Sequence, residues 1–177
     1  MLRKMIVLAA LGLFILPAMP AKAQFQAGDW ELTLGGSGAN GPDFDGTSFG
    51  LQGSIGYFVS KELEISLRQS LSYTDLTTGS DGSAWGASTR LAVDYHFDMG
   101  RLQPYVGASI GIAYGDGAVT ESCFAGPEAG IKYFVNSTTF IQLSVEYQFF
   151  FDGGDDASES FSDGQFLYGL NIGFRWR

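Results

Sequence analysis

Large apolar side chains alternate with small or polar ones along most of the chain after residue 23. The alternation is clearest in the last segment, where every second residue from Phe166 to Trp176 is large and apolar, and Leu167 is the one large apolar residue on the opposite face. A period of two is that of a β-strand whose two faces meet different surroundings. The same pattern predicts strands at about residues 29–38, 48–59, 63–73, 85–97, 104–114, 124–135, 141–149 and 165–176.

The connections between these strands alternate between short and long. The short ones lie near residues 60–62, 98–103 and 136–138, and the long ones at about 39–47, 74–83, 115–123 and 152–164. An up-and-down meander produces this alternation, because every long loop then lies at one end of the sheet. Eight antiparallel strands with no other cover for their edges are expected to close on themselves. The sequence therefore predicts an all-β fold, an eight-stranded antiparallel up-and-down barrel, with a β-sandwich as the alternative.

The apolar face carries its aromatic residues near both ends of the predicted strands. Aromatic girdles on either side of an aliphatic band are typical of a barrel that crosses a membrane. We therefore predict that the apolar face contacts lipid. A soluble ligand carrier, with the apolar face inside, is the alternative. The predicted girdle residues are Trp30, Tyr57, Tyr73, Trp85, Tyr95, Tyr114, Tyr133, Tyr168 and Trp176.

Residues 1–23 have the three parts of a secretory signal peptide. Arg3 and Lys4 begin it, an apolar stretch follows, and Ala21-Lys22-Ala23 forms a small-x-small cleavage pattern before Gln24. The apolar stretch is short for a membrane anchor, and two prolines follow it just before the cleavage site. We predict that residues 1–23 are cleaved and that residues 24–177 form the barrel domain.

Composition agrees with this organisation. The chain has 45% hydrophobic but only 16% charged residues, and its mean hydropathy of +0.08 reflects the alternation of the two faces. Loss of residues 1–23 reduces ten basic residues to seven against nineteen acidic ones, which changes the net charge from −9 to −12. Nucleic acid is therefore not an expected partner. Cys123 is the only cysteine, so no disulfide forms within the chain, and no base near it in sequence marks it as a nucleophile.

The polar face of the strands consists of Gly and Ser with a small set of charged residues. Residues of both signs occur at each predicted depth, as expected for buried charges that pair with one another. We predict a structural, salt-bridged interior that plugs the lumen, with a narrow channel for small solutes as the alternative. The predicted interior charges are Glu31, Glu64, Arg68, Arg90, Asp94, His96, Glu128, Lys132, Glu146 and Arg175.

The four long loops are predicted to be acidic and to contain no Lys or Arg. Such loops are solvated by their charge. A sharper hypothesis is that they recruit divalent cations or meet a cationic partner, which the sequence does not identify. The acidic residues assigned to the loops are Asp43, Asp45, Asp75, Asp81, Asp116, Glu121, Asp152, Asp155, Asp156, Glu159 and Asp163.

No catalytic, cofactor-binding or metal site is predicted. The Gly-x-Gly-x-x-Gly run at residues 36–41 is not followed by a helix, and the Gly-x-Ser-x-Gly runs at 46–50 and 107–111 lie in or at strands. An enzyme hypothesis would have to rest on His96, the only histidine, which Asp94 could orient from the same face. That hypothesis is a lipid-modifying enzyme of the membrane.

The chain resembles the small eight-stranded outer-membrane barrels of Gram-negative bacteria, the porin-family, OmpA/OmpX-like and opacity-protein group. The resemblance is carried by Gly56-Tyr57-Phe58-Val59, Tyr95-His96-Phe97, the segment 102–108, Gly130-Ile131-Lys132-Tyr133-Phe134 and the last strand. It implies a monomeric barrel of the outer membrane, surrounded by lipid and lipopolysaccharide. It also implies insertion by the barrel-assembly machinery, which reads a C-terminal aromatic residue. Here Trp176 is followed by Arg177, and Trp176 is therefore penultimate.

The cleavage site gives a direct prediction. When the full chain is expressed in a Gram-negative host, the protein recovered from the outer membrane should begin at Gln24, because Ala21 and Ala23 fit the small-residue positions of the signal peptidase site. Intact mass measurement checks this. A mature protein that retains residues 1–23 would contradict the assignment.

Overall fold

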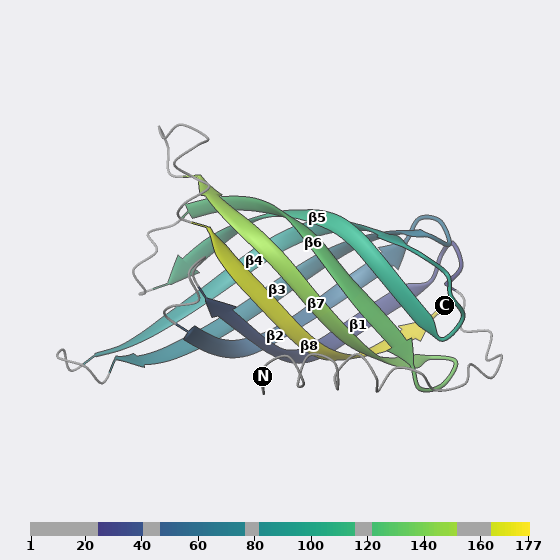
Figure 1. Ribbon diagram of the computed structural model, residues 1–177, viewed down its shortest axis with the longest axis horizontal. Coiled ribbons are helices and arrows are strands. Elements are labelled where there is room, and N and C mark those ends of the chain that lie inside the picture. The colour runs from purple at the N-terminus through teal and green to yellow at the C-terminus, as the bar shows by residue number, and fades with distance from the viewer. Residues whose placement is uncertain (1–24, 41–46, 77–81, 116–121, 152–163) are drawn as a thin grey trace, which may run out of the picture.

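The computed structural model describes residues 25–40, 47–76, 82–115, 122–151 and 164–177, which form one closed antiparallel barrel (Figure 1). Each strand pairs with its neighbours in sequence, and the first strand pairs with the last. This confirms the predicted up-and-down barrel and excludes the β-sandwich. The strands are β1 (Trp30–Asn40), β2 (Thr47–Phe58), β3 (Leu63–Leu76), β4 (Gly82–His96), β5 (Leu102–Gly115), β6 (Ser122–Phe134), β7 (Thr139–Phe151) and β8 (Gln165–Trp176).

The stagger between strands fixes the width of the lumen. Register partners followed around the barrel from Phe58 return to β2 at Ser48, ten residues away from the start. This stagger requires strongly tilted strands, which Figure 1 shows crossing the long axis obliquely. Eight strands enclose a space that side chains can fill. The steps of this circuit are Phe58–Glu64, Glu64–Asp94, Asp94–Gly107, Gly107–Glu128, Glu128–Glu146, Glu146–Leu167, Leu167–Ala39 and Ala39–Ser48.

The two faces of the strands have opposite exposure. On β8, Leu170 and Ile172 point outward and are 58% and 65% exposed, whereas Asn171 between them is 3% exposed. Inward glycines make room for charged neighbours. A Cβ atom on Gly107 would collide with the carboxylate of Asp94 and the carbonyl of Val93. Within the part of the chain that the structure describes, no helix has the length and apolar content to cross a membrane.

Several strands extend further than the alternation predicts. β3 and β4 continue through the pairs Thr74–Ala84, Asp75–Ser83 and Leu76–Gly82. Asp75, predicted in a loop, is therefore part of β3. Backbone pairing continues here without an apolar face, and the side-chain pattern cannot indicate where it stops. The other ten acidic residues assigned to loops lie outside the described residues.

Candidate functional site

The charged residues of the lumen form three pairs of like charge between adjacent strands. Glu64 on β3 lies opposite Asp94 on β4, and Arg68 lies opposite Arg90 on the same two strands. Glu128 on β6 lies opposite Glu146 on β7. All six side chains are buried. Like charges directly opposite one another are destabilising, so each must be neutralised by a residue from another part of the wall.

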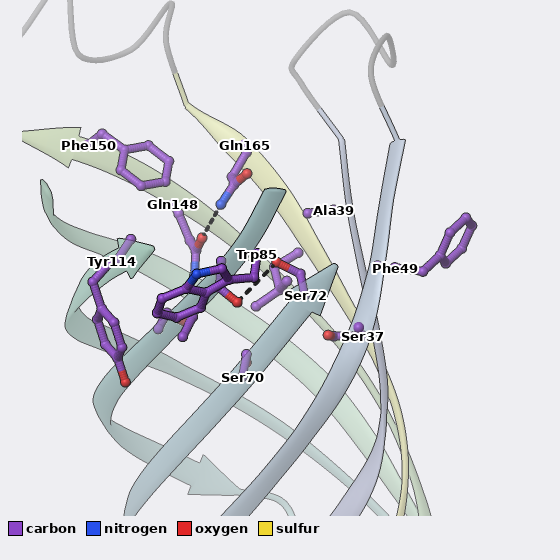
Figure 2. Close-up of a pocket in the computed structure, with 17 residues that line it drawn as sticks. Ser37, Ala39, Phe49, Ser70, Ser72, Trp85, Tyr114, Gln148, Phe150 and Gln165 are labelled. Carbon is purple, nitrogen blue, oxygen red and sulfur yellow. Dashed lines mark hydrogen bonds between the residues drawn. The ribbon is translucent and has the colours of Figure 1, made fainter. Parts of the chain in front are cut away.

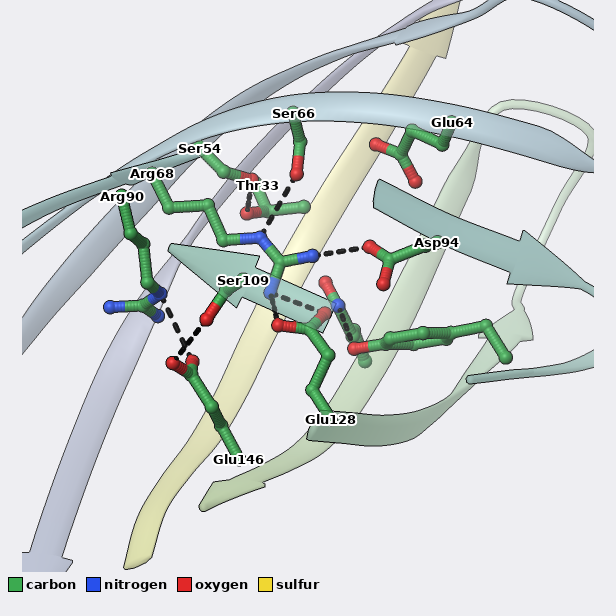
Figure 3. Close-up of polar contacts among 12 residues, drawn as sticks. Thr33, Ser54, Glu64, Ser66, Arg68, Arg90, Asp94, Ser109, Glu128 and Glu146 are labelled. Carbon is green, nitrogen blue, oxygen red and sulfur yellow. Dashed lines mark hydrogen bonds and ion pairs between the residues drawn. The ribbon is translucent and has the colours of Figure 1, made fainter. Parts of the chain in front are cut away.

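That neutralisation comes from across the lumen (Figure 3). The guanidinium of Arg68 reaches Glu128 on β6, with Nη1 2.7 Å from Oε1, and also binds the carboxylate of Asp94. Arg90 reaches Glu146 on β7, with Nε 3.1 Å from Oε2. The Arg68–Glu128 and Arg90–Glu146 pairs therefore connect strands that are three positions apart around the barrel, whereas Asp94 is neutralised by Arg68 on the adjacent strand.

Hydroxyl groups give these charged side chains further hydrogen bonds. Arg68 Nε donates to Ser66 Oγ at 3.0 Å, and Arg90 Nη1 donates to Ser70 Oγ at 2.9 Å. Ser109 Oγ donates to Glu146 Oε1 at 2.6 Å. These bonds matter because a buried ion pair is stable only when its remaining donors and acceptors are also satisfied.

A second layer of charge surrounds Lys132 on β6. Its Nζ lies 2.7 Å from both carboxylate oxygens of Glu31 on β1 and 2.9 Å from Oε2 of Glu64 on β3. His96 Nε2 lies 2.9 Å from the same Glu64 oxygen. The ammonium group also lies 5.2–5.6 Å from the ring centres of Phe25, Phe58, Tyr105 and Phe140, within the range of cation–π attraction.

Below this layer, at the end where the short turns lie, four phenylalanines form a buried cluster of Phe25, Phe58, Phe134 and Phe140. The rings of Phe25 and Phe58 stack with centres 3.8 Å apart. Phe25 precedes the first strand and is only 3% exposed, so the segment before β1 helps to fill the barrel. The alternation of large apolar side chains did not predict this cluster.

The alternation of inward and outward side chains along the strands could have predicted three of these four phenylalanines. Tyr57, Tyr133 and Ile141 point outward, so the adjacent Phe58, Phe134 and Phe140 must point inward. No strand pattern applies to Phe25. Tyr105 and Gln142, which bond to each other inside the lumen at 2.6 Å, follow the same inward parity.

The structure gathers nine of the ten predicted interior charges into the two charged layers. The tenth, Arg175, lies at the rim near the short turns. There its Nη1 is 3.1 Å from Oδ2 of Asp29, and its Nη2 donates to the carbonyl of Ser137. Arg175 differs from the others because it is the second-last residue of β8, at the short-turn end of the barrel.

Three of the lumen residues also have the donor types of a metal site. Ligand atoms of Glu64, Asp94 and His96 lie within 4.8 Å of one another. The same carboxylates, however, are bound by cationic groups, since Lys132 contacts Glu64 and Arg68 contacts Asp94. A metal ion here would be repelled by both, so we assign these residues to the ion-pair network.

The predicted girdle residues all lie on the outward parity of their strands. Trp30 packs against Tyr57 with ring centres 5.0 Å apart. Tyr114 has an additional role, since its hydroxyl accepts a bond from Gln69 Nε2 at 2.9 Å and contacts Thr89 Oγ1 at 3.1 Å. Gln69 and Thr89 are polar residues on the outward face, and this contact satisfies them. Cys123 is exposed on the same face of β6.

Comparison with known proteins places this architecture in context. The family model for the outer membrane protein beta-barrel domain matches residues 6–177. No curated protein matches the chain in sequence. The outer membrane protein OprG from Pseudomonas aeruginosa is similar in structure, with a TM-score of 0.64 and 14% identity over 88% of this chain and 99% of that one.

Two further solved structures resemble the chain. The N-terminal β-barrel domain of Pseudomonas aeruginosa OprF has a TM-score of 0.61 and 24% identity over 86% of this chain and 100% of that one. Ail, the attachment invasion locus protein of Yersinia pestis, has a TM-score of 0.55 and 15% identity over 85% and 100%. At these identities the likeness concerns the fold alone.

The contacts of Arg68 predict that its removal destabilises the folded barrel. Arg68→Met should lower the free energy of unfolding by about 3–5 kcal/mol, because it leaves Glu128 and Asp94 buried without their cation. Lys61→Met, in the turn between β2 and β3, is the control and should leave the free energy of unfolding almost unchanged, because the Lys61–Glu62 pair is exposed to solvent. Urea unfolding of the refolded protein measures both, and equal losses would contradict the assignment.

Proposed function

Because the chain belongs to the outer membrane protein β-barrel family, we propose that it is a non-enzymatic barrel of the bacterial outer membrane with a closed lumen, which serves as a rigid anchor for surface interaction through its loops. The barrel presents an apolar outer face and carries the acidic long loops at one end. The lumen holds the walls together and does not conduct solutes.

This proposal is supported by the layers of side chains that fill the barrel one above the other. The phenylalanine cluster at the short-turn end is followed by the Lys132 layer and then by the pairs of Arg68 and Arg90. The cavity beside these two arginines has a volume of about 10 Å³, close to the ~10–15 Å³ that a single water needs. An ion would have to break buried ion pairs to pass, which disfavours a narrow channel.

The position of His96 argues against a lipid-modifying enzyme. Its side chain is 2% exposed, lies inside the barrel, and is bonded to Glu64. A lipid on the outer face has no access to it. The ring is also packed near Phe25, Phe58 and Tyr105, with ring centres 5.1–5.5 Å away. His96 thus belongs to the structural layer.

The outer face supports lipid as the surrounding partner. Outward residues such as Leu67, Ile110 and Leu170 are 51–62% exposed, which is the arrangement expected of a band in contact with acyl chains. In the outer membrane that contact includes lipopolysaccharide, and insertion of a monomer would use the barrel-assembly machinery. The acidic residues of the long loops suit divalent cations shared with anionic headgroups, or a cationic partner.

Conductance tests the closed lumen. The refolded protein in a planar bilayer should give no steady single-channel current, because each charged layer is paired and the short-turn end is filled by phenyl rings. Heat-modifiable migration of the same sample shows that the barrel is folded. A large, steady conductance from folded protein would contradict the proposal.

A further inference from the structure

A cavity of about 210 Å³ lies above the Arg90–Glu146 pair, at the end of the barrel where the long loops lie (Figure 2). Hydroxyl groups of Ser37 on β1, Ser70 and Ser72 on β3, and Ser88 on β4 line one part of it. Phe150 on β7 and Leu167 on β8 line another part. Gln148 and Gln165 also line the cavity, and Gln165 Nε2 donates to Gln148 Oε1 at 2.7 Å (Figure 2). The lining further includes the aromatic residues Phe49, Trp85 and Tyr114.

The described residues around this cavity carry no charge. The nearest ion pair is internally neutral, since Glu146 binds Arg90 from one side and receives a bond from Gln148 Nε2 at 3.0 Å. Arg90 in turn donates to Ser70 Oγ at the cavity floor. A charged solute that entered would lose water without meeting an opposite charge, which is unfavourable.

The apolar part of the wall is the feature that hydration alone does not explain. Leu167 is the single large apolar residue on the inward face of β8, and Phe150 lies beside the buried Phe124 with ring centres 5.8 Å apart. A vestibule that holds only water would gain nothing from these side chains, because apolar surface facing water is costly. A ligand that covers them while bonding to the serines would gain from both.

We propose that this cavity binds a small, uncharged, polyhydroxylated solute, such as a monosaccharide or a cyclic polyol. Its hydroxyl groups would bond to the serine hydroxyls and glutamine amides, which both donate and accept. Its carbon-bound hydrogens would pack on Phe150 and Leu167. The volume exceeds the ~10–15 Å³ needed for one water by more than tenfold, so a compact ring fits.

The site is a blind pocket if the lumen below is closed, and in that respect it rests on the proposed function. The closed lumen and the binding site can each be disproved without the other. A conducting lumen would contradict the closed barrel without removing the binding site, and loss of binding would leave the closed barrel intact.

Ser37 and Gly36 provide a matched pair of variants. They are adjacent on β1 and therefore face opposite sides of the wall, and a Cβ atom on Gly36 would meet only the Gly50 carbonyl at 3.7 Å. Ser37→Leu places an apolar side chain in the cavity, whereas Gly36→Leu places the same side chain on the outer face at the same height. Heat-modifiable migration verifies that each variant is folded.

Binding is measured by equilibrium dialysis of the refolded protein with methyl glucoside and inositol, and with glucosamine and glucose 6-phosphate as charged probes. Enough salt is added to screen the acidic loop residues. We expect saturable, one-site binding of the uncharged probes and affinities about tenfold or more lower for the charged ones. Ser37→Leu should weaken binding about tenfold or more, equivalent to ~1.4 kcal/mol, and Gly36→Leu should change it less than about twofold.

The proposal is overturned if no uncharged probe binds saturably, if the charged probes bind equally well, or if Ser37→Leu and Gly36→Leu behave alike. Should Ser37→Leu fail to fold, Ser72→Ala replaces it. That variant removes one hydroxyl and should weaken binding about fivefold, the effect of losing roughly one hydrogen bond. Unchanged affinity in Ser72→Ala would then overturn the proposal.

Discussion

Charges buried inside a narrow closed barrel need partners of opposite sign, and most of these partners here lie across the lumen. The register of β3 with β4 sets Glu64 beside Asp94, and that of β6 with β7 sets Glu128 beside Glu146. Neighbouring strands thus bring together charges that repel. Only side chains long enough to cross the lumen can compensate, which is why Arg68, Arg90 and Lys132 carry the pairing. The pairs Arg68–Glu128, Arg90–Glu146 and Lys132–Glu31 connect strands that share no backbone hydrogen bonds.

The two ends of the lumen differ in the groups that surround their buried cations. At the short-turn end, the Lys132 ammonium is enclosed by carboxylates and aromatic rings, and the phenylalanine cluster beneath it keeps water out. At the other end, Glu146 neutralises Arg90 and accepts a hydrogen bond from Gln148, and the described residues that line the space above carry no charge. Among the described residues, one end of the lumen is therefore lined by phenyl rings, while the lining at the other end is uncharged. Outside, the apolar band faces lipid throughout.

The fold could be predicted from the sequence because the two faces of each strand meet contrasting surroundings. Where that contrast fades, prediction failed, as at Asp75, where the ladder of β3 continues beyond the apolar band. The alternation along the strands predicted which charged residues lie inside the barrel, but it did not predict which of them pair with one another. Whether Arg68 meets Glu128 or another acid depends on the stagger around the whole barrel, a long-range property that no local pattern contains. The buried position of Phe25 could not be predicted from the alternation, because this residue lies outside any strand.

A double-mutant cycle on Arg90 and Glu146 measures how strongly charges pair across the lumen. The free energies of unfolding of the protein, Arg90→Met, Glu146→Gln and the double variant give the coupling between two residues on β4 and β7. If charge pairing across the lumen holds the walls together, the coupling should be about 2 kcal/mol or more, with the double variant more stable than the sum of the single losses implies. Additive losses, within about 0.5 kcal/mol, would contradict the account.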